Sequence, residues 1–234
     1  MIFNGCDLSK WFSASFERRI SPELDVATRD VPGLPGARFV RAKVKPLVIP
    51  VKLRWRARPG TSMALLRREV APVLMASEPR PLVLDDEPNV HYMAIMTTQA
   101  ALSNLWYTGT CDIEFTAYDP IAYGRDREAS LTPAGTFEIG GTWPTEPVVT
   151  ARPGGSVSFL RLTDNATGRF VQVTAALTSS SVVVFDMAAP NATVNGATAP
   201  VTFESDFFAL EPGGEASLRL SSGTGTVAWT ERWR

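Results

Sequence analysis

The chain has 234 residues, and its charges almost cancel, with 24 Asp and Glu against 23 Lys and Arg. This length allows one large hydrophobic core or two modest ones, and we expect two domains because domains usually span about 100 to 150 residues. The balanced charge creates no overall field that would select nucleic acid, an anionic membrane or an acidic substrate. No window approaches the roughly 18 to 20 consecutive apolar residues of a membrane span, so we expect no membrane partner.

The first residues, MIFNGCDLSKWF, lack the basic segment, apolar stretch and cleavage site of a secretory signal, so we expect synthesis and folding in a cytoplasm. Residues 12–20 fit neither the helical nor the strand period, and their local structure is left open. Residues 26–31 read as a strand, and 32–36 as a loop because Pro and Gly forbid regular pairing there.

Residues 37–57 are rich in strand-forming types and carry cations with no intervening acid. Along 51–57, one strand face would carry Lys52, Arg54 and Arg56, and the other would be apolar. A nucleic-acid groove has similar charge, but it uses exposed aromatics to stack bases, whereas Trp55 lies on the apolar face. We favour a stripe that is either solvated or turned toward a neighbouring subunit, and in the second case its cations would pair with an acidic turn. The candidate residues are Arg41, Lys43, Lys45, Lys52, Arg54, Arg56, Asp85, Asp86 and Glu87.

A helix is predicted near 62–76. Thr61 or Ser62 can cap it, and apolar residues recur at the spacing of one helical face, namely Met63, Leu66, Val70 and Val73. Pro72 removes a backbone donor within this pattern, so the helix should kink or end about one turn before Ser77.

Residues 79–124 predict the sheet core of the first domain. Residues 82–84 form a buried strand, Asp85, Asp86 and Glu87 open a turn, and 92–96 begin a returning strand. From Gly109 onward apolar and polar residues alternate, as in a strand with one buried face. Asp119, Pro120 and Gly124 are expected to stop it.

After Gly124 the composition changes, and 125–129 reads as a charged joint that leads into a second domain. Turn signals at short intervals separate six predicted strands, a pattern typical of a β-sandwich. They are 156–163, 169–175, 181–187, 197–203, 215–221 and 225–233. Apolar residues share a face of the last strand, so its removal should damage the domain.

Catalytic and metal chemistry find little support in the residues. His91 is the only histidine, no nucleophile motif accompanies it, and we expect a structural role. Cys6 and Cys111 belong to no paired motif and are expected to be buried hydrophobic residues. Adjacent acids at Asp85, Asp86 and Glu87 diverge rather than converge on a cation, so neither a metal nor another cofactor is predicted. An enzyme is not expected.

A family resemblance rests on the order of several phrases. LVLDDEP, HYMA and YDPIAYG in the first half are similar to the N-terminal domain of distal tail (Dit) proteins of long-tailed, siphovirus-type bacteriophages. VVVFDMAAPNATVNG, DFFALEPGGEASLRL and VAWTERW in the second half resemble their galectin-like C-terminal domain. Residues 12–57 carry no matching motif.

The resemblance implies a mainly β fold with two parts: an N-terminal ring-forming β-sheet or β-sandwich domain with one α-helix over 1–128, and a C-terminal galectin-like antiparallel β-sandwich over 129–234. It further implies a hexameric ring in the virion tail tip, assembled in the host cytoplasm. The tail tube protein would bind above the ring and a baseplate hub protein below. DNA would pass through the channel without specific binding, so the Lys52, Arg54 and Arg56 face should point away from the lumen.

The alternative is a carbohydrate-binding adhesin module of the tail tip that acts in host recognition. Its aromatic platform for sugar rings would be Trp143 or the pair Phe207 and Phe208. A sandwich fold alone does not support sugar binding, because one fold serves many functions.

Overall fold

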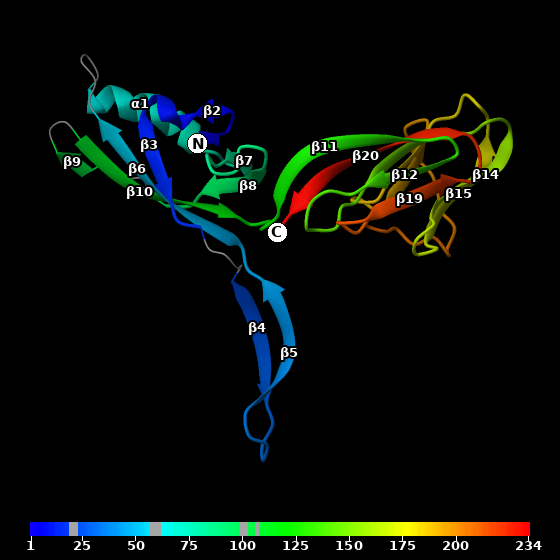
Figure 1. Cartoon of the computed structure of the whole chain (residues 1–234), viewed down its shortest axis with the longest axis horizontal. Helices are drawn as coiled ribbons and strands as arrows, with labels where there is room; N and C mark the ends of the chain where they lie inside the picture. The colour runs from blue at the N-terminus through cyan, green and yellow to red at the C-terminus, as the bar shows by residue number, and fades with distance from the viewer. Residues whose placement is uncertain (19–22, 57–61, 99–102, 106–107) are drawn as a thin grey trace. The chain divides into compact units, whose positions relative to one another are not determined.

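The computed structural model describes residues 1–18, 23–56, 62–98, 103–105 and 108–234. The chain divides into unit 1, Met1–Ala122, and unit 2, Tyr123–Arg234, and each unit has its own hydrophobic core. Strands dominate both units, and the described residues contain one α-helix (Figure 1). The predicted mainly β fold class is therefore confirmed.

Unit 1 is built around two long antiparallel strands, β6 (Leu47–Arg56) and β10 (Thr108–Ala117). The sheet order is β8-β10-β6-β3, with shorter strands attached at its margins. The remaining bounds are β1 (Ile2–Phe3), β2 (Cys6–Asp7), β3 (Phe12–Phe16), β7 (Arg80–Val83), β8 (His91–Met96) and β9 (Ser103–Leu105), with a 3₁₀ turn at Leu8–Lys10. The open stretch 12–20 thus contains the edge strand β3.

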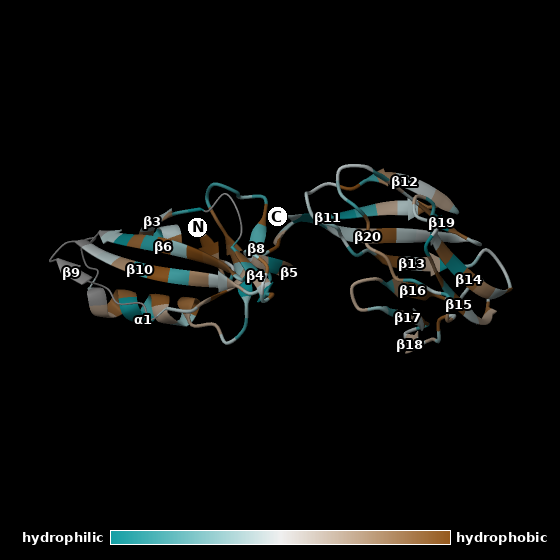
Figure 2. Ribbon diagram, turned by 90° about the horizontal axis from the view of Figure 1, so that it is seen from below, coloured by the Kyte–Doolittle hydropathy of each residue, from teal (hydrophilic) through white to brown (hydrophobic). Residues whose placement is uncertain are grey.

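One face of this sheet is buried and the other is uncovered. Leu53 and Trp55 of β6, and Ile113 and Phe115 of β10, lie in the core, whereas the residues between them are exposed. Figure 2 shows the resulting alternation of apolar and polar residues along both strands. The alternation predicted from Gly109 onward is confirmed.

The helix α1 (Met63–Leu74) contributes its apolar side to the core of unit 1. Ser62 caps it by accepting a hydrogen bond from the Leu65 amide at 3.2 Å. Leu66, Val70 and Leu74 are buried. The helix ends two residues after Pro72, as the missing backbone donor predicts.

Two strands of unit 1 form a sheet by themselves. β4 (Leu24–Asp30) pairs with β5 (Ala37–Val44), and among the described residues neither pairs with any other strand (Figure 1). The basic stretch 37–57 is therefore divided between two sheets, because β5 belongs to this hairpin and β6 to the core sheet. We call residues 24–44 the hairpin.

Unit 2 is a sandwich of two antiparallel sheets around one core. The first sheet has the order β18-β17-β16-β13-β20-β11 and the second the order β12-β19-β14-β15. Their bounds are β11 (Ala122–Leu131), β12 (Ala134–Glu138), β13 (Val148–Arg152), β14 (Val157–Asp164), β15 (Phe170–Leu177), β16 (Val183–Asp186), β17 (Asn191–Val194), β18 (Ala197–Thr198), β19 (Glu215–Leu220) and β20 (Thr224–Trp233).

The structure corrects three predictions in the second half. The charged joint at 125–129 is part of the continuous strand β11, whose exposed charges meet partners on β20: Arg127 pairs with Glu231 at 2.9 Å. Gly124 lies within β11 and does not end a strand. The predicted strand 197–203 shrinks to Ala197–Thr198, since the chain then turns to follow the edge of β15.

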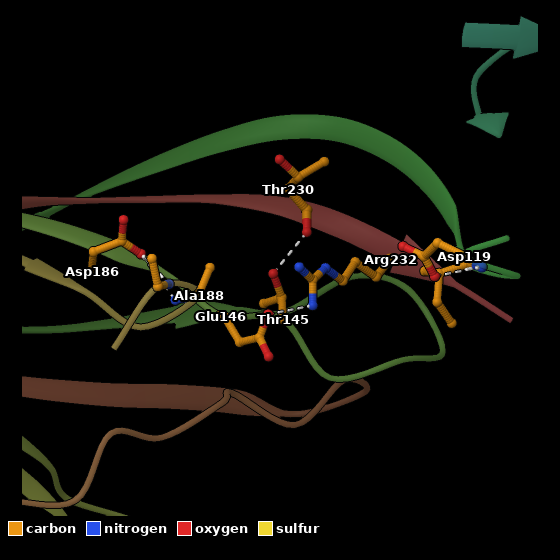
Figure 3. Close-up of polar contacts among 9 residues, drawn as sticks. Asp119, Thr145, Glu146, Asp186, Ala188, Thr230 and Arg232 are labelled. Atoms are coloured by element: carbon orange, nitrogen blue, oxygen red, sulfur yellow. Dashed lines mark hydrogen bonds and ion pairs between the residues drawn. The ribbon is translucent and has the colours of Figure 1, made fainter. Parts of the chain in front are cut away.

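The last strand is held by both apolar and polar contacts. Trp229 is buried and stacks on Phe137 with ring centroids 4.7 Å apart. The Thr145 hydroxyl donates to the Thr230 carbonyl at 2.8 Å, and Arg232 pairs with Glu146 at 2.8 Å (Figure 3). β20 is thus an integral strand of unit 2. No helix among the described residues has the length and apolar character needed to cross a membrane.

Candidate subunit interface

The hairpin has one exposed apolar face. Leu24 lies opposite Val44, and Val26 lies opposite Ala42. Beyond a β-bulge, Phe39 lies opposite Thr28, which is on the same face as Val26, so Phe39 continues the apolar face. Leu24 and Val26 are each 49% exposed, and Phe39 is 68% exposed. A two-stranded sheet has no second layer to cover such a face.

The other hairpin face is cationic. Lys43 lies opposite Asp25, but Arg29 lies directly opposite Arg38, and Arg41 follows on the same face. Like charges at directly opposed positions are destabilising, so an acidic partner would relieve this pair. Lys45, just beyond β5, has its own acid: its ammonium donates to Glu23 at 2.6 Å, and this hydrogen bond raises the pKa of Lys45.

The predicted cations of β6 lie elsewhere, on the uncovered face of the core sheet. Lys52 and Arg54 are exposed there, whereas the side chain of Arg56 lies outside the described part of the chain. Lys52 is 3.8 Å from Asp112, its direct neighbour on β10. This face therefore mixes charges and is not purely cationic.

The acidic turn already has partners within the chain. The amino group of Met1 pairs with Asp85, and Arg18 bridges Asp86 at 3.1 Å and Glu87 at 2.7 Å. The same guanidinium donates to the Tyr92 hydroxyl at 2.7 Å. Burial raises the pKa of Tyr92, although the positive charge of Arg18 acts in the opposite direction. The sequence interpretation missed Arg18 because it lies in the stretch 12–20 that fitted no period.

The structure buries one part of the candidate sugar platform. Phe208 is only 2% exposed, so it cannot offer a ring face to a ligand, and Phe207 packs against the core. Trp143 is half-buried, and the Arg234 guanidinium lies 4.4 Å from its ring centroid. The exposed aromatics of unit 2 are instead Phe159, Phe203 and Trp233, and sequence periodicity did not single out any of them as exposed.

His91 and the two cysteines all lie in unit 1. His91 is the first residue of β8 and is half-buried. Cys111 is buried in the core of unit 1, whereas Cys6 is partly exposed. Across the ranges that the structure describes, His, Cys, Asp and Glu form no group of three that could hold a metal ion.

Two family models match separate parts of the chain. Residues 7–117 match the phage tail protein RIFT-related domain, and residues 140–233 match the C-terminal domain of a siphovirus-type tail component. Together these matches extend over most of both units. No protein among the curated sequences compared matches the chain.

One solved structure shares its fold with the whole chain. The crystal structure of the Dit protein (gp 19.1) of phage SPP1, described as a paradigm of the hub adsorption apparatus in phages that infect Gram-positive bacteria, has a TM-score of 0.85 and 18% identity. The match covers 100% of this chain and 98% of that one. The phage P2 baseplate in its Ca-activated conformation has a TM-score of 0.46 and 9% identity, with 92% and 90% coverage.

Proposed function

Because this chain belongs to the distal tail proteins of siphovirus-type bacteriophages, we propose that its copies close into a ring between the tail tube and the tail tip. The chain is a structural protein of the phage tail. In the proposed ring, six copies enclose the channel through which DNA passes, with the tail tube protein above and a baseplate hub protein below. Unit 1 builds the ring, unit 2 offers docking surfaces on its galectin-like sandwich, and no catalytic step is involved.

The observation that carries this proposal is the hairpin. Its apolar face cannot be covered by its own two strands, and an isolated two-stranded hairpin is at best marginally stable in water. A neighbouring copy can cover it, and in a closed cyclic arrangement every copy both presents and receives a hairpin. Closure thus protects all the hairpins at once and leaves no free end for fibre growth.

Charge supports the same contact. Arg41 and Lys43 lie on the cationic hairpin face, and the acidic turn at Asp85, Asp86 and Glu87 is the candidate partner on the next copy. Its three carboxylates outnumber the two cations that hold them, so the turn keeps a net negative field. Such complementarity speeds association and selects the partner.

We place Lys45, Lys52, Arg54 and Arg56 at the margin of this contact and away from the channel. Fixed cations on a channel wall would bind phosphates and retard DNA. A ring structure in which Lys52 and Arg54 line the lumen would overturn this part of the proposal.

The test is the solution mass of the purified chain, measured by sedimentation over a range of concentrations. The full chain should form a closed oligomer, and a variant in which residues 24–44 are replaced by a short Gly-Ser linker should remain monomeric with an unchanged thermal unfolding profile for unit 2. A linker variant that assembles as well as the full chain would remove the hairpin from the interface.

A further inference from the structure

The cationic face of the hairpin changes in character along its length. Near the base its charges are balanced, because Lys43 lies directly opposite Asp25. Toward the tip the balance is lost, because Arg29 lies directly opposite Arg38. The excess of positive charge is therefore confined to the outer half of the hairpin, which ends at the tip loop 31–36.

The β-bulge in β5 creates this excess. Val40 has no opposing residue on β4, whereas its neighbours Phe39 and Arg41 are each paired. Without the extra residue, strict alternation would place Phe39 on the same face as Arg41 and would turn Arg38 to the apolar face. The bulge instead brings Arg38 to the cationic face, next to Arg41 and opposite Arg29.

The three guanidinium groups of this outer half are open to a partner. Arg29, Arg38 and Arg41 are all exposed, and within the described part of the chain no carboxylate forms an ion pair with any of them. Asp30, the nearest acid in sequence, lies opposite Ala37 and so belongs to the other face. Like charges at directly opposed positions destabilise a sheet, so an external anion here would relieve a repulsion as well as add an attraction.

The acidic turn of a neighbouring copy cannot neutralise this charge alone. Asp85, Asp86 and Glu87 carry three carboxylates but are held by two cations of their own chain, which leaves one negative charge. The hairpin face has three positive charges in excess, because Asp25 offsets one of its four cations, which are Arg29, Arg38, Arg41 and Lys43. Two positive charges therefore remain after the proposed subunit contact, and the opposed pair of arginines at the outer end accounts for them.

The spacing and composition of the face define the ligand. Successive side chains on one face of a strand are about 6.6 to 6.8 Å apart, which is also the spacing of alternate carboxylates in an extended acidic peptide. Arginine binds a carboxylate through two parallel hydrogen bonds. The residues of this face, at 25, 27, 29, 38, 41 and 43, include no aromatic side chain on which a nucleic-acid base could stack.

We propose that Arg29, Arg38 and Arg41 dock an extended acidic segment of another protein, with carboxylates at alternate residues of that segment. On a tail protein, this contact would attach a neighbouring component of the tail to each copy. The site lies beyond the proposed subunit contact, and it needs the hairpin but not a closed ring.

The test titrates the purified full chain with two fluorescent octapeptides and follows their anisotropy. The acidic probe alternates Glu and Thr, and the neutral control carries Gln in place of every Glu. At low ionic strength we expect the acidic probe to bind with a dissociation constant on the order of 100 μM or below. The neutral probe should bind at least about tenfold more weakly because it lacks the charge-assisted pairs. A salt concentration of about 0.3 M should weaken binding of the acidic probe, since the cations are exposed.

Two variants assign the binding to the hairpin, and each should weaken binding of the acidic probe at least about tenfold. The double variant Arg29→Gln, Arg38→Gln removes the opposed pair. Arg38→Glu creates a complementary cross-strand pair with Arg29, which stabilises the hairpin, so a loss of binding in this variant does not come from a disordered hairpin. The matched control Arg67→Gln, Arg68→Gln removes two exposed cations from α1 and should bind as the unmodified chain does.

Equal binding of the two peptides, or full binding by both hairpin variants, would overturn the proposal. A DNA duplex of about 12 base pairs is the third probe, and a duplex that binds more tightly than the acidic peptide would assign the face to nucleic acid instead. A chain that stays monomeric but binds the acidic probe would contradict the ring and leave this site standing, so the two proposals fail separately.

Discussion

Replacing the exposed apolar side chains of the hairpin should prevent assembly without destabilising the single chain. Phe39 and Val26 share the apolar face and are 68% and 49% exposed. Full burial of such a side chain contributes about 1.5 to 3 kcal/mol. Burial of the exposed fractions by a neighbouring copy would therefore contribute roughly 2 to 3 kcal/mol per interface for the two residues together.

The double variant Val26→Ser, Phe39→Ser tests this reasoning. A loss of that size weakens each subunit contact roughly 30- to 150-fold, since 1.4 kcal/mol corresponds to a factor of about ten. Sedimentation at several concentrations measures the shift. The matched control is Phe203→Ser, which removes a fully exposed ring from unit 2 and should leave association unchanged. If the double variant assembles at the same concentration as the unmodified chain, the hairpin face is not the subunit contact.

Three further predictions concern the stability of each unit. Leu66→Ala should destabilise unit 1 by about 2 to 5 kcal/mol because the Leu66 side chain is fully buried. Leu65→Ala on the same helix should cost less than about 1 kcal/mol because Leu65 is half-exposed. Denaturant titration measures the free energy of unfolding of both variants. Burial raises the folded-state pKa of Tyr92 above its ordinary value of about 10, so the stability linked to its neutral form is complete below about pH 10 and is lost as pH rises through the folded-state pKa. Unfolding measured against pH should show a smaller alkaline loss for Tyr92→Phe, and identical alkaline profiles would contradict this. Any side chain at Gly223 would collide with the Arg152 carbonyl oxygen, whereas Gly213 has the same positive φ but open space around it. Gly223→Ala should therefore lower the melting temperature of unit 2 more than Gly213→Ala does. Equal shifts in melting temperature would refute the packing argument.

Local periodicity predicted the parts of the fold in which one side of an element is buried. The alternation around Leu53 and Ile113 and the helical spacing of Leu66 and Val70 each reflect a single buried face, and the structure places all four in the core. Such patterns depend on which side of an element is covered, and they can be read without knowing its neighbours.

The wrong predictions concern features that local sequence periodicity does not encode. β11 looked like a joint because Arg125 to Glu128 are all charged, but both of its faces are exposed there and its partners lie about a hundred residues later on β20. The hairpin was predicted as strand but not as a separate sheet, because composition does not specify which strands pair. Phe208 looked available for stacking, although alternate residues of its segment, Phe208 and Leu210, point into the core.

In the candidate interface too, local exposure could be predicted from the sequence but long-range contacts could not. Exposure of Lys52 and Arg54 followed from alternation, and the structure confirms it. The partners of the acidic turn did not follow, because Arg18 reaches Glu87 across a separation of nearly seventy residues. Long-range pairing of this kind has to be seen in three dimensions.

The most direct test of the ring is electron microscopy of virions that carry this protein, with the tail end resolved well enough to trace unit 1. We predict a closed annulus of six copies where the tail tube meets the tip, in which the hairpin of each copy lies against the next. An absence of any annulus at that junction, together with a purified chain that stays monomeric when concentrated, would contradict it.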